Sequence, residues 1–290
     1  MKLIIGSNGF LGKSLCNRFK KSGDEFICMN SESAGVLNPS NFQRLNDSEI
    51  SHVYHLGSKT YVPDSWEHPA DFLQVISEGT LNVLKFCHLK KVPLTFVSAY
   101  IYGNQVDQPI KENTQPSKSN PYAHSKLIAE KYCEFYRDFM DLKVNILRPF
   151  NIYGPSQDNK FFIPSLLNQA LTKPTVKLEN VITKRDFIFS EDVTDALIAS
   201  EHFIENGSTY NVGSGISYSI EDIIQIIGEK IGKKLIIETE NNIRKNEILN
   251  TVASVEKIKN DLGWYSKHTI HQGLELTIKD AMASSEEKCF

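Results

Sequence analysis

The 290-residue sequence predicts an α/β fold: a doubly wound parallel sheet, followed toward the C-terminus by a smaller α/β unit. Three observations lead to this prediction. Short apolar segments alternate with segments of helical periodicity over the first 150 residues. A glycine-rich turn directly follows the first apolar segment. After residue 150 the pattern becomes less regular and richer in turn residues.

The predicted elements follow in order along the chain. Leu3-Ile4-Ile5 is expected to be a buried strand, because it is continuously apolar and stops at a glycine. Residues 10–22 place their apolar side chains on one helical face, and Gly23 ends that helix. Further strands are expected at 25–29, 52–56, 94–97 and 144–147, and further helices at 72–88, 122–140 and 219–231.

Composition argues against several classes of partner. The net charge of -3 and a pI near 6.3 do not suit a nucleic-acid-binding protein. No apolar stretch is long enough for a membrane helix, and the N-terminal apolar run is too short for a signal peptide. The five cysteines are widely spaced and lack a CxxC pair, as expected for a reducing cytoplasm without disulfides. No metal site is expected, since His52 and His55 would point to opposite faces of a strand and His268 and His271 lack neighbouring ligands.

A glycine turn of the form GxxGxxG joins the first strand to the first helix. Gly6, Gly9 and Gly12 allow the sharp turn and the close approach of a pyrophosphate to the free N–H groups of the helix. In this position the motif predicts a Rossmann domain that binds a dinucleotide. The cofactor-binding residues expected from the turn are Gly6, Asn8, Gly9, Phe10, Leu11 and Gly12.

The second strand ends at Asn30 and Ser31, where NAD-binding proteins usually carry a carboxylate that holds the ribose 2′-hydroxyl. Asn30 carries no charge that would repel a 2′-phosphate, and no Lys or Arg lies beside it to attract one. The sequence therefore leaves NAD and NADP both open, with the missing carboxylate favouring NADP(H) slightly.

Tyr122 and Lys126 form a YxxxK pair at the start of a predicted helix, behind the N-cap Asn120 and Pro121. The pair by itself is expected once by chance. At this helix start the two side chains share one face, where a cation would lower the pKa of the phenol. Ser98, at the end of a predicted strand, is the third candidate. The three residues predict proton transfer to or from a hydroxyl while hydride moves to or from a nicotinamide.

The motifs, taken in order, resemble the extended short-chain dehydrogenases of the nucleotide-sugar epimerase/dehydratase family. They are GSNGFLG, VYHLGS, FVSAYIYGN, NPYAHSK, LRPFNIYGP, KRDFIFSEDV and YNVGSG, and they cover residues 3 to about 265. The resemblance implies that Leu56, Gly57, Ser58 and Phe150 contact the cofactor together with Tyr122 and Lys126. It also implies contacts to a nucleoside-diphosphate sugar from Ser98, Ala99, Tyr100, Asn151, Arg185, Arg244 and Glu247.

The same resemblance implies the domain organisation. Residues 1–150 would form the NAD(P)-binding Rossmann domain, with 187–213 returning to it. Residues 151–186 and 214–290 would bind the nucleotide sugar. The helices at 72–88 and 122–140 would form a four-helix bundle in a homodimer.

Departures from the family pattern limit which of the family's activities we expect. Ala99 and Tyr100 follow Ser98 where the 4,6-dehydratases carry acidic residues, so a dehydratase is not expected. Val36 and Ile76 replace an aspartate and an asparagine of the family, which bears on cofactor affinity. We expect an epimerase that acts at C4 through a keto intermediate, with a 4-keto-6-deoxyhexose reductase as the alternative. A non-catalytic dinucleotide sensor is the more remote possibility.

Overall fold

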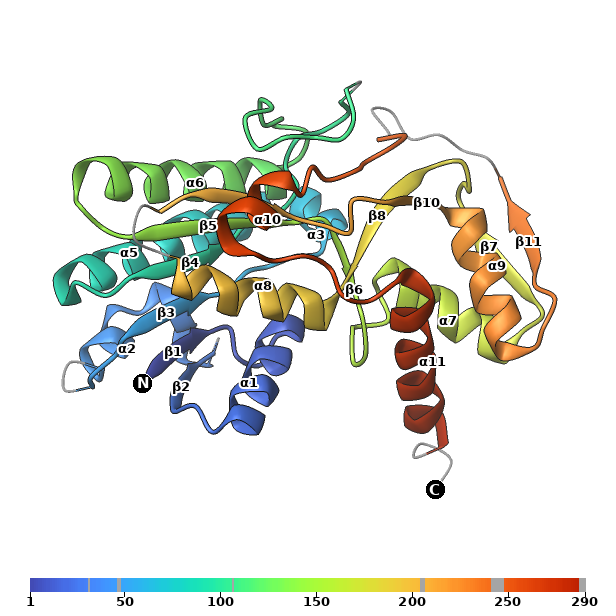
Figure 1. Cartoon of the computed structure of the whole chain (residues 1–290), viewed down its shortest axis with the longest axis horizontal. Coiled ribbons are helices and arrows are strands. Elements are labelled where there is room, and N and C mark those ends of the chain that lie inside the picture. The colour runs from blue at the N-terminus through green and yellow to red at the C-terminus, as the bar shows by residue number, and fades with distance from the viewer. Residues whose placement is uncertain (31, 46–47, 106, 204–206, 241–247, 287–290) are drawn as a thin grey trace.

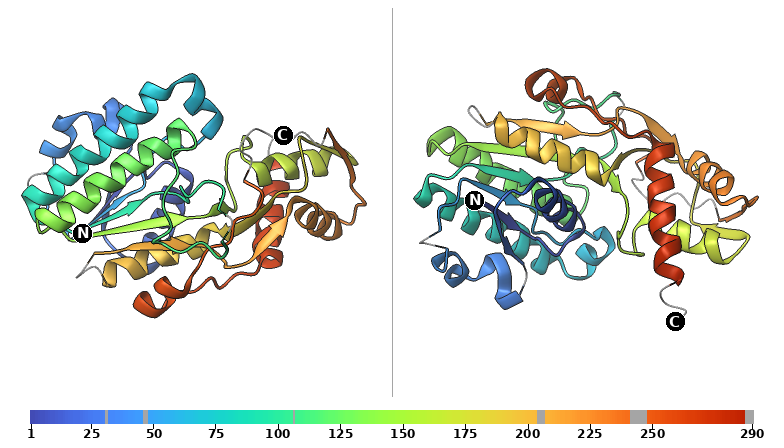
Figure 2. Two further views of the ribbon diagram at one scale, coloured as in Figure 1. Left: turned by 90° about the horizontal axis from the view of Figure 1, so that it is seen from above. Right: turned by 60° about the horizontal axis from the view of Figure 1, so that its bottom comes forward.

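The computed structural model describes residues 1–30, 32–45, 48–105, 107–203, 207–240 and 248–286 (Figure 1). A larger lobe is built around one parallel sheet, and a smaller lobe lies beside it (Figures 1 and 2). No described helix is both long and apolar enough to span a membrane. Within the same residues, no three His, Cys, Asp or Glu side chains gather in a way that could hold a metal ion.

The sheet of the larger lobe has six parallel strands in the order β2-β1-β3-β4-β5-β9. This arrangement confirms the predicted doubly wound α/β fold, and the predicted strands are found within about two residues of their expected ends. The strands are β1 (Lys2–Ile5), β2 (Phe26–Met29), β3 (His52–His55), β4 (Leu94–Val97), β5 (Val144–Pro149) and β9 (Thr209–Val212).

Helices cover both faces of this sheet, which explains why its strands are apolar on both sides. One face packs against α1 (Phe10–Ser22) and α8 (Ser190–His202). The other face packs against α5 (Gly79–Lys90) and α6 (Pro121–Phe139), which lie side by side in Figure 2. Alternate residues of β1 show the division, since Ile4 faces the first pair of helices while Leu3 and Ile5 face the second.

The helix predicted at 72–88 differs from the observed structure. The chain forms α4 (Pro69–Phe72), then the π-helical segment η2 (Leu73–Glu78), and only then α5. The wider turn appears in the hydrogen bond from the Gly79 N–H to the carbonyl of Gln74, five residues back. This lobe also contains three shorter segments: η1 (Glu32–Leu37), α2 (Pro39–Gln43) and α3 (Val62–Glu67).

The smaller lobe combines two small sheets with three helices around a separate apolar core. Its helix α9 begins with a capping box, in which Ser219 and Asp222 bond each other's backbone N–H groups. The strands are β6 (Asn151–Tyr153), β7 (Thr175–Leu178), β8 (Lys184–Phe189), β10 (Ser217–Ser219) and β11 (Ile236–Thr239). The helices are α7 (Phe162–Thr172), α9 (Ile220–Ile231) and α11 (Ile270–Glu286).

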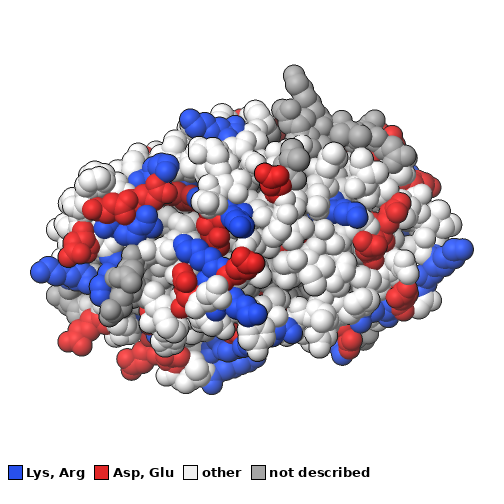
Figure 3. Space-filling model, turned by 45° about the horizontal axis from the view of Figure 1, so that its top comes forward, with Lys and Arg blue, Asp and Glu red and all other residues white. Residues whose placement is uncertain are grey.

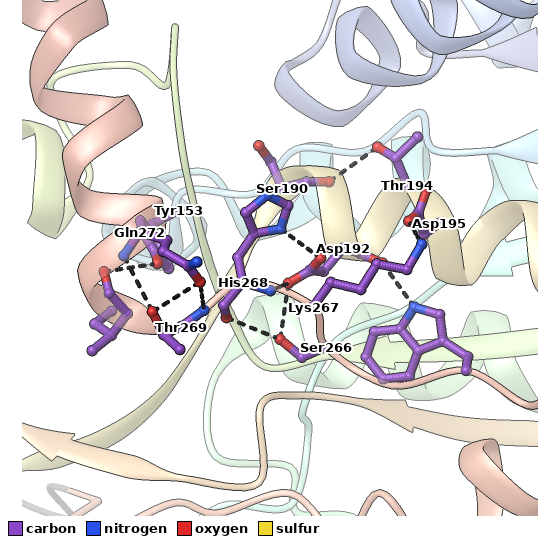
Figure 4. A network of polar contacts seen from close by, with 12 residues as sticks. Tyr153, Ser190, Asp192, Thr194, Asp195, Ser266, Lys267, His268, Thr269 and Gln272 are labelled. Carbon is purple, nitrogen blue, oxygen red and sulfur yellow. Dashed lines mark hydrogen bonds and ion pairs between the residues drawn. The ribbon is translucent and has the colours of Figure 1, made fainter.

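Asp192 on α8 ties the larger lobe to the segment that leads into α11 (Figure 4). Its carboxylate accepts hydrogen bonds from the Ser266 hydroxyl at 2.8 Å and the His268 backbone N–H at 3.0 Å, and lies 2.8 Å from His268 Nδ1. The indole N–H of Trp264 donates to the Asp192 carbonyl at 3.0 Å. These contacts fix where α11 starts.

Two segments bear on the predicted domain division, which itself stays a prediction. The return of the chain to the larger lobe is seen in α8 and in β9, which pairs with β5. Helix α10 (Glu256–Leu262) also packs against α8 and β9, although the prediction placed these residues with the nucleotide-sugar domain. Ile258 and Leu262 join the apolar core on that face of the sheet, which gives the physical reason for the difference.

Candidate active site

A cavity of about 390 Å³ opens at the carboxyl end of the parallel strands, where the two lobes meet. The glycine turn, the end of β4 and the first turns of α6 all contribute to its wall. The predicted site residues that line it are Gly6, Gly9, Phe10, Leu11, Gly12, Leu56, Ser58, Ser98, Ala99, Tyr100, Tyr122, Lys126, Phe150 and Asn151. Sequence positions spread over some 145 residues therefore converge on one cavity.

The glycine turn is packed as tightly as the motif requires. Gly6 has φ +88°, and a Cβ there would lie 2.6 Å from the backbone nitrogen of Gly57. A Cβ on Gly12 would lie 2.1 Å from the Gly6 carbonyl oxygen, so this glycine brings α1 onto the turn itself. The Ser7 hydroxyl beside it is buried and lacks a partner among the described residues. The turn thus fits a dinucleotide, whose pyrophosphate would meet the N–H groups at the start of α1.

Ser98, Tyr122 and Lys126 come from two elements that are joined directly. The Lys126 ammonium donates a hydrogen bond of 2.7 Å to the carbonyl of Val97, the residue before Ser98. The Asn120 side chain caps α6 by accepting from the Ala123 N–H at 2.8 Å, which fixes the helix start that carries Tyr122. The Ser98 hydroxyl is buried, lines the cavity and has no protein partner in the described chain. It is therefore available to a bound substrate oxygen.

Burial dominates the protonation of this cluster. It raises the pKa of Tyr122 well above the ordinary value, and Tyr100 adds to the rise. It lowers the pKa of Lys126 to about 7, against the opposing effect of Glu130. The sequence led us to expect that Lys126 lowers the pKa of Tyr122, whereas in this structure burial and Tyr100 both raise it. The acid/base role of Tyr122 stays a prediction.

Tyr100 and Asn151 connect the cavity to the smaller lobe. The Tyr100 ring stacks on Phe150 at 5.3 Å between centroids, and its hydroxyl donates to Asn151 Oδ1 at 3.1 Å. The Asn151 amide in turn donates to the Asp186 carbonyl at 3.0 Å. The buried Asp186 carboxylate accepts from the backbone N–H groups of Ser214, Gly215 and Ala253 at 2.8 to 3.0 Å. This carboxylate holds together three segments behind the cavity.

Several predicted site residues lie elsewhere. Asn8 is exposed, Asn30 is half-buried beyond the end of β2, and Gly57 supports Gly6 from behind. Arg185 does not line the cavity, and its guanidinium donates to the carbonyls of Lys184 and Ile248. Ser31, Arg244 and Glu247 lie outside the described residues. Their proposed contacts to cofactor or substrate stay predictions.

The smaller lobe adds an apolar wall to the cavity that was not predicted from the sequence. Its members are Ile152, Tyr153, Phe161, Phe162, Ile163 and Phe187. The available signal was the apolar triplet Phe161-Phe162-Ile163 at the start of a helix, which by itself also fits an ordinary buried helix start. Only the position of the first residues of α7 on the cavity wall distinguishes the two.

Comparison with known proteins identifies relatives over nearly the whole chain. Residues 2–213 match the family model described as the NAD dependent epimerase/dehydratase family. A GDP-6-deoxy-D-mannose reductase of Pseudomonas aeruginosa is 29% identical, covering 96% of this chain and 95% of its own. A GDP-6-deoxy-D-talose 4-dehydrogenase of Aggregatibacter actinomycetemcomitans is 30% identical, with 90% of each chain covered.

One more distant relative and one solved structure are also similar to this chain. A UDP-glucose 4-epimerase of Mycolicibacterium smegmatis is 24% identical over 96% of this chain and 97% of its own. The solved structure of RMD from Pseudomonas aeruginosa complexed with NADPH superimposes with a TM-score of 0.89 at 28% identity. That match covers 97% of this chain and 98% of the other.

Proposed function

This chain belongs to the NAD-dependent epimerase/dehydratase family, as its motifs predicted, and we propose that within the family it is an NADPH-dependent reductase. Its substrate would be a nucleoside-diphosphate 4-keto-6-deoxyhexose, whose C4 carbonyl it would reduce to a hydroxyl. The cluster of Ser98, Tyr122 and Lys126 in one cavity carries this proposal. The names of the relatives at 29% and 30% identity both support a 6-deoxyhexose, and the second also supports reaction at C4. For this reason we propose the reductase first, although the sequence led us to expect an epimerase.

The apolar wall from the smaller lobe supports a deoxy sugar. Phe161, Phe162 and Ile163 offer no side-chain hydrogen-bond partner, so they suit the methyl group of a 6-deoxyhexose better than a hydroxymethyl group. The nucleoside diphosphate would extend across the smaller lobe. On the face shown in Figure 3, acidic and basic side chains are interspersed, without a broad positive region of the kind that nucleic acids require.

In carbonyl reduction, Ser98, Tyr122 and Lys126 would each have a separate role. NADPH supplies the hydride when bound. Ser98 donates a hydrogen bond to the carbonyl oxygen and steadies it, while Tyr122 delivers the proton that converts this oxygen to a hydroxyl. Lys126, fixed by its bond to the Val97 carbonyl, supplies positive charge that stabilises the Tyr122 phenolate left behind.

Turnover of NADPH with a nucleoside-diphosphate 4-keto-6-deoxyhexose tests the proposal. The purified protein should oxidise NADPH only when the keto sugar is present. Tyr122→Phe should lower kcat by about 10²- to 10⁴-fold, because it removes the proton donor. Tyr61→Phe is a matched control, since Tyr61 contacts Phe161 but does not line the cavity. Full activity of Tyr122→Phe would refute the assignment.

An epimerase is the second candidate, supported by the relative at 24% identity that covers 96% of this chain. It would use the same three side chains, but its cofactor would stay bound and be regenerated. Denaturing the purified protein distinguishes the two. Release of nearly one NAD per chain, with interconversion of two nucleotide sugars, would favour the epimerase.

Asn30 supports NADP(H), since its neutral amide at the end of β2 does not repel a 2′-phosphate. We therefore expect NADPH to bind more tightly than NADH. Asn30→Asp should weaken NADPH at least about tenfold and spare NADH, because it adds a like charge beside the phosphate. Unchanged preference in this variant would contradict the role of Asn30.

We further propose that the enzyme is a cytoplasmic homodimer joined through α5 and α6. Leu89, Phe135 and Phe139 are 80%, 51% and 76% exposed along these two helices, an apolar set that a second copy would cover. Phe139→Lys combined with Phe135→Lys should shift the protein from dimer to monomer in sedimentation. The double substitution Leu276→Lys with Met282→Lys, on exposed positions of α11, should leave the dimer intact.

A further inference from the structure

A buried ion pair lies directly behind Lys126. Glu130 follows Lys126 by one helical turn, so the two side chains lie on the same side of α6. Both are buried, with 2% of Lys126 and none of Glu130 exposed. Arg148 on β5 binds both Glu130 oxygens, through Nε at 2.9 Å and Nη2 at 2.6 Å. The forked contact fixes the carboxylate in both position and orientation.

Arg148 is itself held from a second direction. Its Nη1 donates to the Tyr102 hydroxyl at 2.8 Å and to the Glu112 carbonyl at 3.1 Å. The Tyr102 hydroxyl donates a hydrogen bond to Asn211 Oδ1 at 2.6 Å, and the Asn211 backbone N–H donates to the Glu112 carboxylate at 2.9 Å. The guanidinium therefore has little freedom to leave Glu130.

The charges around Lys126 are unevenly distributed. From its own helix it faces Glu130, the Cys133 thiol and the Tyr122 phenol, and from β3 it is near the His55 imidazole. Burial holds the pKa of His55 to about 3, so this ring is neutral at the pH of the cell. Among these described neighbours, Glu130 is the carboxylate that favours the charged form of Lys126, and Arg148 binds both of its oxygens.

We propose that Glu130, fixed by Arg148, is a positioning residue that keeps Lys126 protonated and aimed at the end of β4. An isolated lysine at this depth loses much of its charge near neutral pH, since burial lowers the pKa of Lys126 to about 7 even with Glu130 present. The carboxylate favours the ammonium form, and its rigid hold prevents it from forming a direct pair that would draw Lys126 from Val97. The inference rests on the proposed function only where it concerns turnover.

Lysine-selective NMR titration tests the charge directly, with Lys126→Met used to assign the signal. Glu130→Gln should lower the Lys126 titration midpoint by about one to two pH units. Arg148→Lys keeps a cation beside Glu130 and should leave the midpoint near its wild-type value. A midpoint that stays in place in Glu130→Gln would overturn the proposal.

Glu130→Gln could also unfold the protein, because it leaves a buried Arg148 without its carboxylate, which is strongly destabilising. A second variant therefore separates loss of folding from loss of the charge on Lys126. The double variant Glu130→Met with Arg148→Met replaces the pair by apolar side chains of similar size, a change that such sites often tolerate. It should fold, and its Lys126 midpoint should also fall. An unchanged midpoint in this folded variant would equally refute the role of Glu130.

Turnover supplies the second readout. Glu130→Gln should lose kcat at a pH above its shifted midpoint and regain it when the pH is lowered by about one to two units, with KM for the sugar unchanged. A purely structural role predicts a loss that does not recover with pH. If no nucleotide sugar is turned over by the wild type, the proposed function fails while the NMR titration still decides the role of Glu130.

Discussion

Gly12→Ala is the substitution whose cost the structure defines most clearly. Inside a helix this change ordinarily stabilises a protein by about 0.5 to 1 kcal/mol. Here the new Cβ would lie 2.1 Å from the Gly6 carbonyl oxygen and 2.7 Å from the Ser7 Cα, whereas such contacts are essentially never under 3.0 Å. The helix and the turn must therefore separate by about 1 Å. Neither can move freely, because Gly6 donates to the Met29 carbonyl at 2.7 Å and lies against Gly57.

The expected cost follows from these contacts. Overpacking of this kind costs about 1 to 3 kcal/mol. The hydrogen bond from the Gly9 N–H to the Gly6 carbonyl, 3.1 Å long, would also be strained, at up to about 1 kcal/mol. After the helix-propensity gain is subtracted, the free energy of unfolding should fall by about 2 kcal/mol, or a few degrees in Tm for a chain of this size.

Denaturant unfolding without cofactor measures this change, and Gly9→Ala is the matched control. Gly9 has φ -73° and its Cβ would meet only the Gly6 carbonyl, at 3.2 Å, so the free protein should lose little stability. Gly9 lines the cavity, so this variant should weaken NADPH binding instead. If Gly12→Ala is as stable as the wild type, or more stable, the packing argument is wrong.

Three further predictions concern the smaller lobe and the buried charges. Gly273→Ala places a Cβ 2.1 Å from the hydroxyl of Tyr153, which lines the cavity. Calorimetry should show nucleotide-sugar binding about tenfold weaker and NADPH binding unchanged. Equal loss of both affinities would contradict this prediction. Asp186→Asn replaces one accepting oxygen by an NH2 donor that faces buried N–H groups, and it should cost about 3 kcal/mol in denaturant unfolding. A loss below about 0.5 kcal/mol would mean that these segments hold together without the carboxylate. Lys126 has a folded-state pKa of about 7 against 10.5 when unfolded, so the unfolded chain binds the extra proton between these values. The free energy of unfolding should therefore rise with pH across that window in the wild type, and the rise should be absent in Lys126→Met.

Local chemistry was sufficient to predict the larger lobe. Continuous apolar strands, the GxxGxxG turn and the Asn120-Pro121 helix start are all signals carried by neighbouring residues, and each predicted strand is present. The π-helical segment at Leu73–Glu78 could not be predicted, because apolar spacing does not reveal a single widened turn. The orientation of Arg185 could not be predicted from the sequence either, because the carbonyl that its guanidinium binds belongs to Ile248, 63 residues away.

The sequence alone determined which side chains could carry the chemistry, because Ser98, Tyr122 and Lys126 are recognisable from their places at a strand end and a helix start. Tertiary structure decided what state those side chains adopt. Burial, and not the neighbouring lysine, controls the pKa of Tyr122, and desolvation depends on everything that packs around a group. Likewise, only the fold brings Arg148 of β5 onto Glu130 of α6 and α7 onto the rim of the cavity, because contacts between distant segments leave no periodic trace in the chain.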